Sequence, residues 1–480
     1  MSTRARKRST PHGGAFCFLR RPLKRFFVAK IAWAFYDFLQ ISLRQPKKCG
    51  IIGMIYITSE VNVMDSKSIR TILSDTAYVK QAGTEKEKRC AEYIKGLCHQ
   101  MGLAARTEEF PLDLFQTHTE RLTVDHEEIA CRGYQGAPSG CACAKLYYLQ
   151  STDAYSVKKC KNKVVLIDHP LNSDLYKGLA QSGAKGIITY SGNANFPDDD
   201  IDIKRIGFHT DPGAGIPVVN VHIKSAFRLI KKQGKECCIC LEQSRHTAHS
   251  QNVILDIAGE SEKQIVITAH YDTTALSVGA YDNMSGSIAL LYMAEHFAKR
   301  KNKLSLRLVW CGGEELGLLG SLEYCRAHSS ELENTVLNIN LDMIGAVMGE
   351  FTAFSCADEK MKASLESFLK RHRFGGAVQY KIRSSDSNSF IHFGVPAVSF
   401  ARYAPSTLAQ THTRYDTANI LSPKSLLKDM KIITAFVGDL LCDFESFAPI
   451  TISQEIKTAV EKYMAKKIYP AWLENMKRKE

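Results

Sequence analysis

The chain has 480 residues, which is too long for a single hydrophobic core and favours two or three domains. Its formal net charge of +13 would suit a protein that binds nucleic acid or an anionic membrane. Residues 1–63, however, hold twelve Lys or Arg and only two Asp or Glu, so they carry +10 of this charge and leave +3 for the rest. We therefore expect no nucleic-acid partner and do not expect a membrane partner for the body of the protein.

The fifteen cysteines are odd in number and scattered along the chain. Such a distribution in a large protein favours reduced thiols in the cytoplasm over a disulfide framework. Cys141 and Cys143, or the cluster at Cys237, Cys238 and Cys240, could bind a metal, but no C-x-x-C pair supports this. We therefore predict a cytoplasmic protein without structural disulfides.

Residues 1–63 contain two basic clusters followed by the apolar stretch FFVAKIAWAFYDFLQISL. Lys30 and Asp37 interrupt that stretch, and no small-residue cleavage site follows it. A membrane anchor, a secretion signal and a membrane-surface helix are the alternatives that it leaves open. We interpret the segment as a poorly ordered basic extension and expect the folded protein to begin near Met64.

Residues 64–114 predict two amphipathic helices, the second over Glu85 to Met101, and then a strand through AARTEEF. No catalytic residue is expected in this part. Residues 115–245 then alternate strands and helices, as in KNKVVLID and IPVVNVHIKSAFRLIKK, and lack the repeated series of acid-ending strands found in the later half. We predict a separate inserted domain here, and we interpret its aspartates at 198–200 and 202 as a solvated loop, because their spacing matches no calcium site.

Residues 246–452 carry the polar residues that interrupt apolar strands. Three strand-like runs, QIVITAHYD, LSLRLVW and VLNINLDMIG, each end in acidic or imidazole groups. The groups that follow these runs or the next glycine turn are His270, Asp272, Asp282, Glu314, Glu315 and Asp342. Alternating strands and helices predict an α/β fold with a mostly parallel sheet covered by helices on both faces, where such groups meet at the carboxyl ends of the strands.

Several carboxylates gathered around one histidine are costly as packing, because buried like charges repel. A divalent cation would neutralise them, and imidazole with carboxylate and no sulfur suits zinc, manganese or cobalt. Asp282 could bridge two ions, each of which also needs ligands of its own. A second histidine should then follow downstream, and His412 does so in THTRYDT.

Five blocks along this half resemble the signature blocks of family 28 of the metallopeptidases, in the family's order. They are AHYDTTALSVGAYDNMSGSIALL, CGGEELGLLGS, NLDMIG, SDSNSF and THTRYDT. The resemblance implies a zinc exopeptidase fold with two Zn²⁺, for which Mn²⁺ or Co²⁺ could substitute, and a β-rich protease-associated domain inserted at residues 115–245. It implies one ion on His270 and Asp342, a second on Glu315 and His412, Asp282 as the bridge, Glu314 as general base, and Asp272 as the carboxylate that orients His270.

The activity implied by the resemblance is removal of a terminal residue, most often the N-terminal one, from a peptide or amino-acid amide. A carboxypeptidase or dipeptidase, a glutaminyl cyclase-type acyltransferase with one zinc, and a receptor-like protein without metals remain alternatives. Tyr281 and Ser387 depart from the family pattern, which puts pocket shape and substrate choice in doubt. Asp416 could orient His412 or be a plain turn residue. Residues 453–480 predict a charged helix to which we assign no catalytic or binding role.

Overall fold

The computed structural model describes residues 64–195, 200–206, 215–447 and 449–467. The predicted basic extension, residues 1–63, lies outside these ranges, as do Asp198 and Asp199. Within them no helix is both long enough and apolar enough to cross a membrane.

Four parallel strands form the centre of the sheet that residues 246–452 build. In spatial order they are β14 (Ala397–Tyr403), β11 (Thr335–Leu341), β9 (Ser261–His270) and β10 (Leu304–Cys311). The sheet continues antiparallel on both sides, with β12 (Glu350–Cys356) beside β14 and β8 (Glu236–Ile257) beside β10. β13 (Ala377–Tyr380) pairs parallel to β12 at the edge. The predicted mostly parallel sheet is confirmed for its centre.

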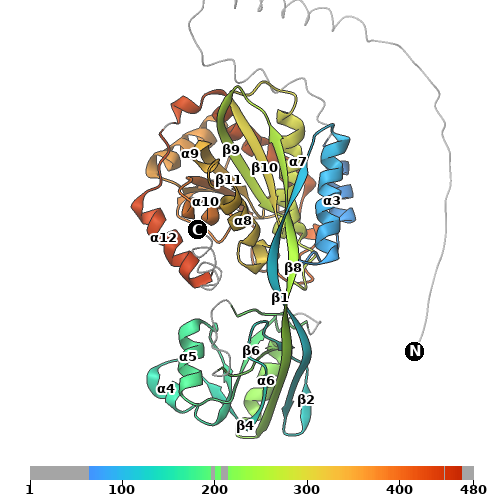
Figure 1. Cartoon of the computed structure of the whole chain (residues 1–480), viewed down its shortest axis with the longest axis vertical. Coiled ribbons are helices and arrows are strands. Elements are labelled where there is room, and N and C mark those ends of the chain that lie inside the picture. Colours follow the sequence, from blue (N-terminus) through green and yellow to red (C-terminus); the bar gives the residue numbers. More distant parts are fainter. Residues whose placement is uncertain (1–63, 196–199, 207–214, 448, 468–480) are drawn as a thin grey trace, which may run out of the picture. The chain divides into compact units, whose positions relative to one another are not determined.

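Helices cover both faces of this sheet, which explains why its strands are apolar on both sides (Figure 1). One face shares a core with the helices α2 (Ser66–Asp75), α3 (Glu85–Gln100), α7 (Ser285–Phe297), α9 (Glu359–Arg371) and α11 (Pro423–Cys442). The other face packs on α8 (Leu319–Ala327), α10 (Ser387–His392) and α12 (Gln454–Lys467). Both helices predicted for residues 64–114 therefore form and contribute to the main core.

The C-terminal helix α12 is amphipathic and docked. Its residues Ile456, Val460 and Met464 are buried in one apolar cluster with Leu322 of α8 and Ile391 of α10. The predicted charged helix is thus present over Gln454–Lys467, and its charged residues Glu455, Lys457, Glu461 and Lys462 are exposed. Residues 468–480 of the predicted helix lie outside the described ranges.

The segment proposed as an insert has strands and helices of its own. Its strands β4 (Gly140–Leu149), β5 (Lys163–Ile167), β6 (Gly186–Ser191) and β7 (Val218–His222) run parallel to one another. The helices are α4 (Ala154–Lys158), α5 (Ser173–Gln181) and α6 (Ile223–Lys231), and the short strands β2 (Glu127–Ile129) and β3 (Arg132–Gly133) complete it. β1 (Arg106–Val124) and β8 pair antiparallel along almost their whole length, so the boundaries proposed at 114/115 and 245/246 fall inside continuous strands.

Two disulfides correct the prediction that the cysteines are reduced. Cys141 is bonded to Cys240 and Cys143 to Cys238. Each pair lies directly opposite across the antiparallel strands β4 and β8, so the two-residue spacing on each strand puts all four on one face. Because disulfides form mainly in oxidising compartments, the cysteine count no longer supports a cytoplasmic protein.

We predict that removing residues 1–63 leaves the fold intact, whereas removing residues 1–84 does not. Met64 is buried, and α2 places Ile69, Ile72 and Leu73 in the main core. The second truncation removes these side chains and exposes the core surface that they cover. Burial of each such side chain contributes about 1.5–3 kcal/mol to stability. Thermal unfolding should show a melting temperature within about 2 °C of the full chain for the first truncation and a clear fall for the second. A large loss for the first would show that residues 1–63 pack on the body.

Candidate metal centre

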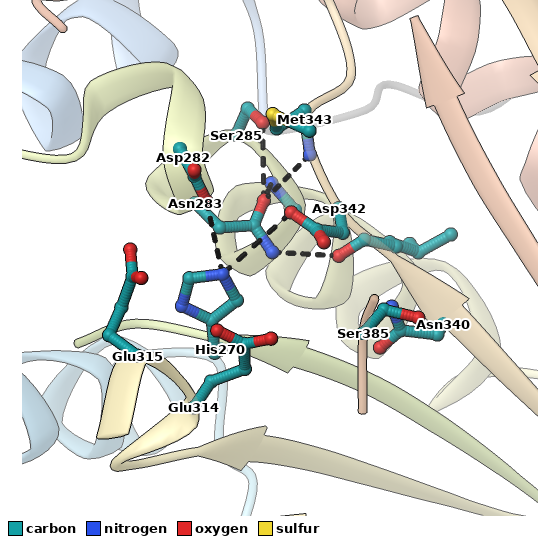
Figure 2. A network of polar contacts seen from close by, with 12 residues as sticks. His270, Asp282, Asn283, Ser285, Glu314, Glu315, Asn340, Asp342, Met343 and Ser385 are labelled. Carbon is teal, nitrogen blue, oxygen red and sulfur yellow. Dashed lines mark hydrogen bonds and ion pairs between the residues drawn. The ribbon is translucent and has the colours of Figure 1, made fainter. Parts of the chain in front are cut away.

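The predicted site residues meet at one edge of the sheet, because the four central strands are parallel neighbours. His270 is the last residue of β9, Asp342 follows β11 directly, and Glu314 and Glu315 begin the turn after β10. Figure 2 shows these side chains pointing toward one another around His270. The local cause is that each strand stops where its apolar run stops, so its next polar residue emerges at this edge.

Asp282 lies in the turn Ala280–Met284 that precedes α7, and its two carboxylate oxygens face different partners. Oδ1 is 3.2 Å from Nε2 of His270, and Oδ2 is 3.3 Å from Nε2 of His412. His270 Nε2 is also 3.7 Å from Oδ1 of Asp342, and His412 Nε2 is 3.2 Å from Oε2 of Glu315. The ligand atoms thus form two groups, His270–Asp282–Asp342 and Asp282–Glu315–His412, that share Asp282.

The two groups differ in exposure. His270, Asp282 and Asp342 are buried, whereas the side chain of His412 is 50% exposed. His412 comes from the long loop after β14 and has a left-handed backbone, with φ of 63°. The second group therefore lies on the open side of the site, where a substrate would approach.

Asp272 contacts both neighbouring motifs. Its Oδ1 accepts the backbone N–H of Glu314 at 3.0 Å, and its Oδ2 accepts that of Glu315 at 3.2 Å. Nδ1 of His270 lies 3.3 Å from the backbone oxygen of Asp272 and 3.5 Å from its Oδ1. The carboxylate of Asp272 thus holds the turn that carries both glutamates, and the nearest Asp272 atom to the His270 ring is the backbone oxygen. The orienting role that the resemblance implies for the carboxylate stays a prediction.

The gathering of these acidic groups shifts the pKa values of several residues in the cluster. Burial, followed by the neighbouring carboxylates, raises the pKa of Glu314 and of Glu315 well above the usual range. Burial alone would lower the pKa of His270, but the surrounding carboxylates outweigh it and raise that pKa well above its ordinary value. Each shift means that the cluster stabilises added positive charge.

The residues present fit divalent cations of the zinc type. Each group offers imidazole nitrogen and carboxylate oxygen without sulfur, which suits a catalytic rather than a structural zinc site. Two buried oxygens, Oδ1 of Asp342 and Oε1 of Glu315, have no hydrogen-bond donor among the described residues. Buried carboxylate oxygens without donors are expected where a cation completes their coordination.

Asp416 holds the turn of Asp282 and does not contact His412, which corrects the role we considered for it. Its two oxygens accept the backbone N–H groups of Tyr281 at 2.8 Å and of Asp282 at 3.1 Å. Asn283 ties the other side of this turn to β11: its Nδ2 donates to the backbone oxygen of Leu341 at 2.8 Å (Figure 2). Asp282 therefore sits on a backbone that is fixed from two directions.

Arg383 and Glu87 support the site and were not found from the sequence. Arg383 donates to Oδ2 of Asp342 at 3.0 Å and to its backbone oxygen at 2.9 Å. Glu87 accepts the hydroxyl of Ser250 at 2.6 Å, and a Cβ at Gly312 would lie only 2.7 Å from its Oε1. Burial raises the pKa of Glu87 to about 8. Nothing in the local pattern around either residue signals these contacts, which join segments far apart in the chain.

The two departures from the family pattern are buried. The hydroxyl of Tyr281 donates to the backbone oxygen of Arg402 at 2.6 Å, and that of Ser387 lies 2.8 Å from Ser385 Oγ. Neither belongs to the two ligand groups. Their contacts fix the scaffold around the site.

Known aminopeptidases are similar to this chain in sequence and in fold. Aminopeptidase YwaD of Bacillus subtilis is 26% identical over 414 residues, which cover 80% of this chain and 86% of that protein. Aminopeptidase Y of Saccharomyces cerevisiae is 26% identical over 216 residues, or 41% of this chain and 40% of that one. A solved structure of BSAP, a zinc aminopeptidase from Bacillus subtilis, superposes with a TM-score of 0.67 at 24% identity, covering 80% of this chain and 96% of that chain. The aminopeptidase from Aneurinibacillus sp. strain AM-1 gives a TM-score of 0.63 at 21% identity, over 78% and 93% of the two chains.

The fold is that of the zinc aminopeptidases, with the predicted residues at the carboxyl edge of its sheet. Residues 252–437 match the family model described as peptidase family M28. This part of the chain is thus similar to the M28 peptidases, and the relatives named above are aminopeptidases.

We predict that Asp272→Asn weakens zinc binding by about 10–100-fold, as is typical when the partner behind a metal ligand is lost. An amide cannot accept both N–H groups of Glu314 and Glu315, so the turn that carries Glu315 loses one of its two anchors. Calorimetric titration of the metal-free protein with zinc measures the change. Asp439→Asn, an exposed carboxylate paired with Arg371, is the matched control and should bind zinc as the unmodified protein does. Equal affinity in both variants would contradict the role of Asp272.

Proposed function

We propose that the chain is a di-zinc exopeptidase that removes the N-terminal residue from peptides. The observation that carries the proposal is the position of Asp282, which offers one oxygen to each of two histidine-carboxylate groups. A carboxylate shared in this way suits two ions held side by side. In the proposed assignment His270 and Asp342 hold one ion, Glu315 and His412 hold the other, and Asp282 bridges them.

Two zinc ions in such a site would polarise the scissile carbonyl and make a water molecule acidic at neutral pH. The remaining steps belong to side chains of this chain. Glu314 is next to a ligand but belongs to neither ligand group, so its carboxylate is free to take the proton of the attacking water and pass it to the leaving amine. The carboxylate of Asp272 accepts the backbone N–H of Glu314 and so keeps Glu314 in place, and the backbone oxygen of Asp272 contacts Nδ1 of the His270 ring.

The choice of the N-terminus as the point of attack rests on the names of the relatives, several of which are aminopeptidases. A panel of amino-acid amides, dipeptides, and peptides with a blocked N-terminus or C-terminus tests it with zinc-loaded enzyme. An aminopeptidase should cleave the amides and lose activity on N-blocked peptides. Cleavage of N-blocked peptides with loss on C-blocked ones would identify a carboxypeptidase instead.

Metal content provides a direct test. The purified chain should bind two zinc ions, lose its peptidase activity after dialysis against a chelator, and recover it when zinc is returned. The reason is the presence of two complete ligand groups around Asp282. Metal analysis at saturating zinc gives the count. One ion would favour the glutaminyl cyclase-type alternative, and none would favour a receptor-like protein.

Glu314 and Glu315 are neighbours with the same chemistry, yet their substitutions should differ. Glu314→Gln should keep two ions and lower kcat by about 10²–10⁴-fold, with KM much less affected, because only proton transfer is lost. Glu315→Gln should bind one ion more weakly, because an amide is a poor replacement for a carboxylate ligand. Metal content and kcat are measured on both variants side by side. If Glu314→Gln sheds an ion while Glu315→Gln keeps two, the two roles are reversed.

A further inference from the structure

A buried lysine, Lys80, precedes residues 252–437, which match the M28 model, and contacts the loop that leads to Asp282. Lys80 belongs to the connection between α2 and α3, in the part of the chain for which no catalytic residue was predicted. Its side chain is 0% exposed. A lysine is almost never fully buried unless its charge is compensated, so its position requires an explanation.

The ammonium of Lys80 donates to three backbone oxygens. Nζ lies 3.1 Å from the oxygen of Thr76, 3.1 Å from that of Tyr78 and 2.5 Å from that of Val278. A charged ammonium has three N–H donors and a neutral amine only two, so these three acceptors match the charged form. Thr76 and Tyr78 are close in sequence, whereas Val278 is 198 residues away, in the loop that leads to Asp282.

The backbone of Lys80 is bonded to the same loop. Its N–H donates to Oγ1 of Thr273 at 2.8 Å, and its carbonyl oxygen accepts the N–H of Thr273 at 3.1 Å. Thr273 directly follows Asp272, whose carboxylate accepts the backbone N–H groups of Glu314 and Glu315. The α2–α3 connection is thus attached both to the start of the loop, at Thr273, and to its middle, at Val278.

Asp416 anchors the far end of this loop. It accepts the N–H groups of Tyr281 and Asp282, and the hydroxyl of Ser277 lies 3.4 Å from its Oδ2. Space inside the loop is tight, because a Cβ at Gly279 would lie 2.4 Å from Cγ2 of Thr273. Together, Lys80 and Asp416 bond to residues 273, 277, 278, 281 and 282, so little freedom is left for the bridging carboxylate.

The charges of the two anchors are complementary. Burial lowers the pKa of Lys80, and Asp416 and Asp272 oppose that shift. Burial raises the pKa of Asp416 to about 6, while Lys80 acts in the opposite direction. Each group makes the burial of the other less costly.

We propose that Lys80 is a positioning residue of the metal centre: from the α2–α3 connection it fixes residues 273–278, and together with Asp416 it sets the position in which Asp282 bridges two ions. The inference rests on the di-zinc function proposed above. It makes the segment before the M28 match an integral part of the site.

Lys80→Met tests this proposal, because methionine has a similar length and no charge. Losing the bond to Val278 should let the loop relax and move Asp282 away from both ions. We expect both zinc affinities to fall by roughly tenfold or more, as for other residues that support metal ligands, and kcat to fall at least tenfold with a smaller change in KM. Lys88→Met, an exposed lysine on α3, is the matched control and should change none of these values.

The outcomes separate the possible roles. A lower melting temperature with unchanged zinc affinities and kcat would mean that Lys80 only stabilises the fold. Tighter zinc binding would mean that the charge of Lys80 only repels the zinc ions. Either result overturns the proposal. If Lys80→Met does not fold, Thr273→Val is used instead, because it removes the hydroxyl that accepts the backbone N–H of Lys80. Both zinc affinities should then fall, but by less than in Lys80→Met. Unchanged affinities in that variant overturn the proposal equally.

A double-mutant cycle with Asp416→Asn adds a second test. Because both residues act on one loop, the losses of zinc affinity should be less than additive when the two substitutions are combined. Strict additivity would overturn the joint role. The unmodified protein is titrated in the same series. If it binds no zinc, the proposed function fails. If the unmodified protein and Lys80→Met both bind two ions with the same affinities, that function stays intact and only this inference is overturned.

Discussion

The repulsion between buried carboxylates is the constraint on which the rest of this structure depends. Six acidic side chains gather at one edge of the central sheet: Asp272, Asp282, Glu314, Glu315, Asp342 and Asp416. The cationic side chains that face them are His270, His412, Arg383 and Lys80. Burial of so many like charges is tolerated only where further positive charge can enter, which is the physical reason for the two divalent cations that we propose at this site.

The fold fixes the positions of the site residues at this edge of the sheet. Four parallel strands end side by side, and each end supplies or leads into one motif. Helices bury both faces of the sheet, so the strand ends cannot shift independently. Backbone N–H groups then hold the carboxylates: Asp272 is held by the turn of the two glutamates, and Asp416 by the turn of Asp282. The positions of the ligand residues are therefore fixed by hydrogen bonds of the protein itself, which is what tight binding by a small number of ligands requires.

Much of this site could be predicted from the sequence, because strand ends and glycine turns are local patterns. His270, Asp282, Glu315 and Asp342 follow such signals, and His412 was expected because a second ion needs a histidine of its own. The structure brings these five residues together. Contacts between distant segments leave no local signal, so Lys80, Glu87 and Arg383 were missed and Asp416 was considered for the wrong partner. The disulfides were missed for the same reason: only the register of β4 against β8 shows that the two C-x-C pairs face each other.

The central claim is that Asp282 bridges two ions, and anomalous diffraction at the zinc edge from crystals of the zinc-loaded protein tests it most directly. The account predicts two peaks about 3.5–4 Å apart, the separation of other two-metal sites. One should lie between His270 and Asp342, the other between Glu315 and His412, with one oxygen of Asp282 on each. A single peak, or two peaks of which only one contacts Asp282, would contradict it.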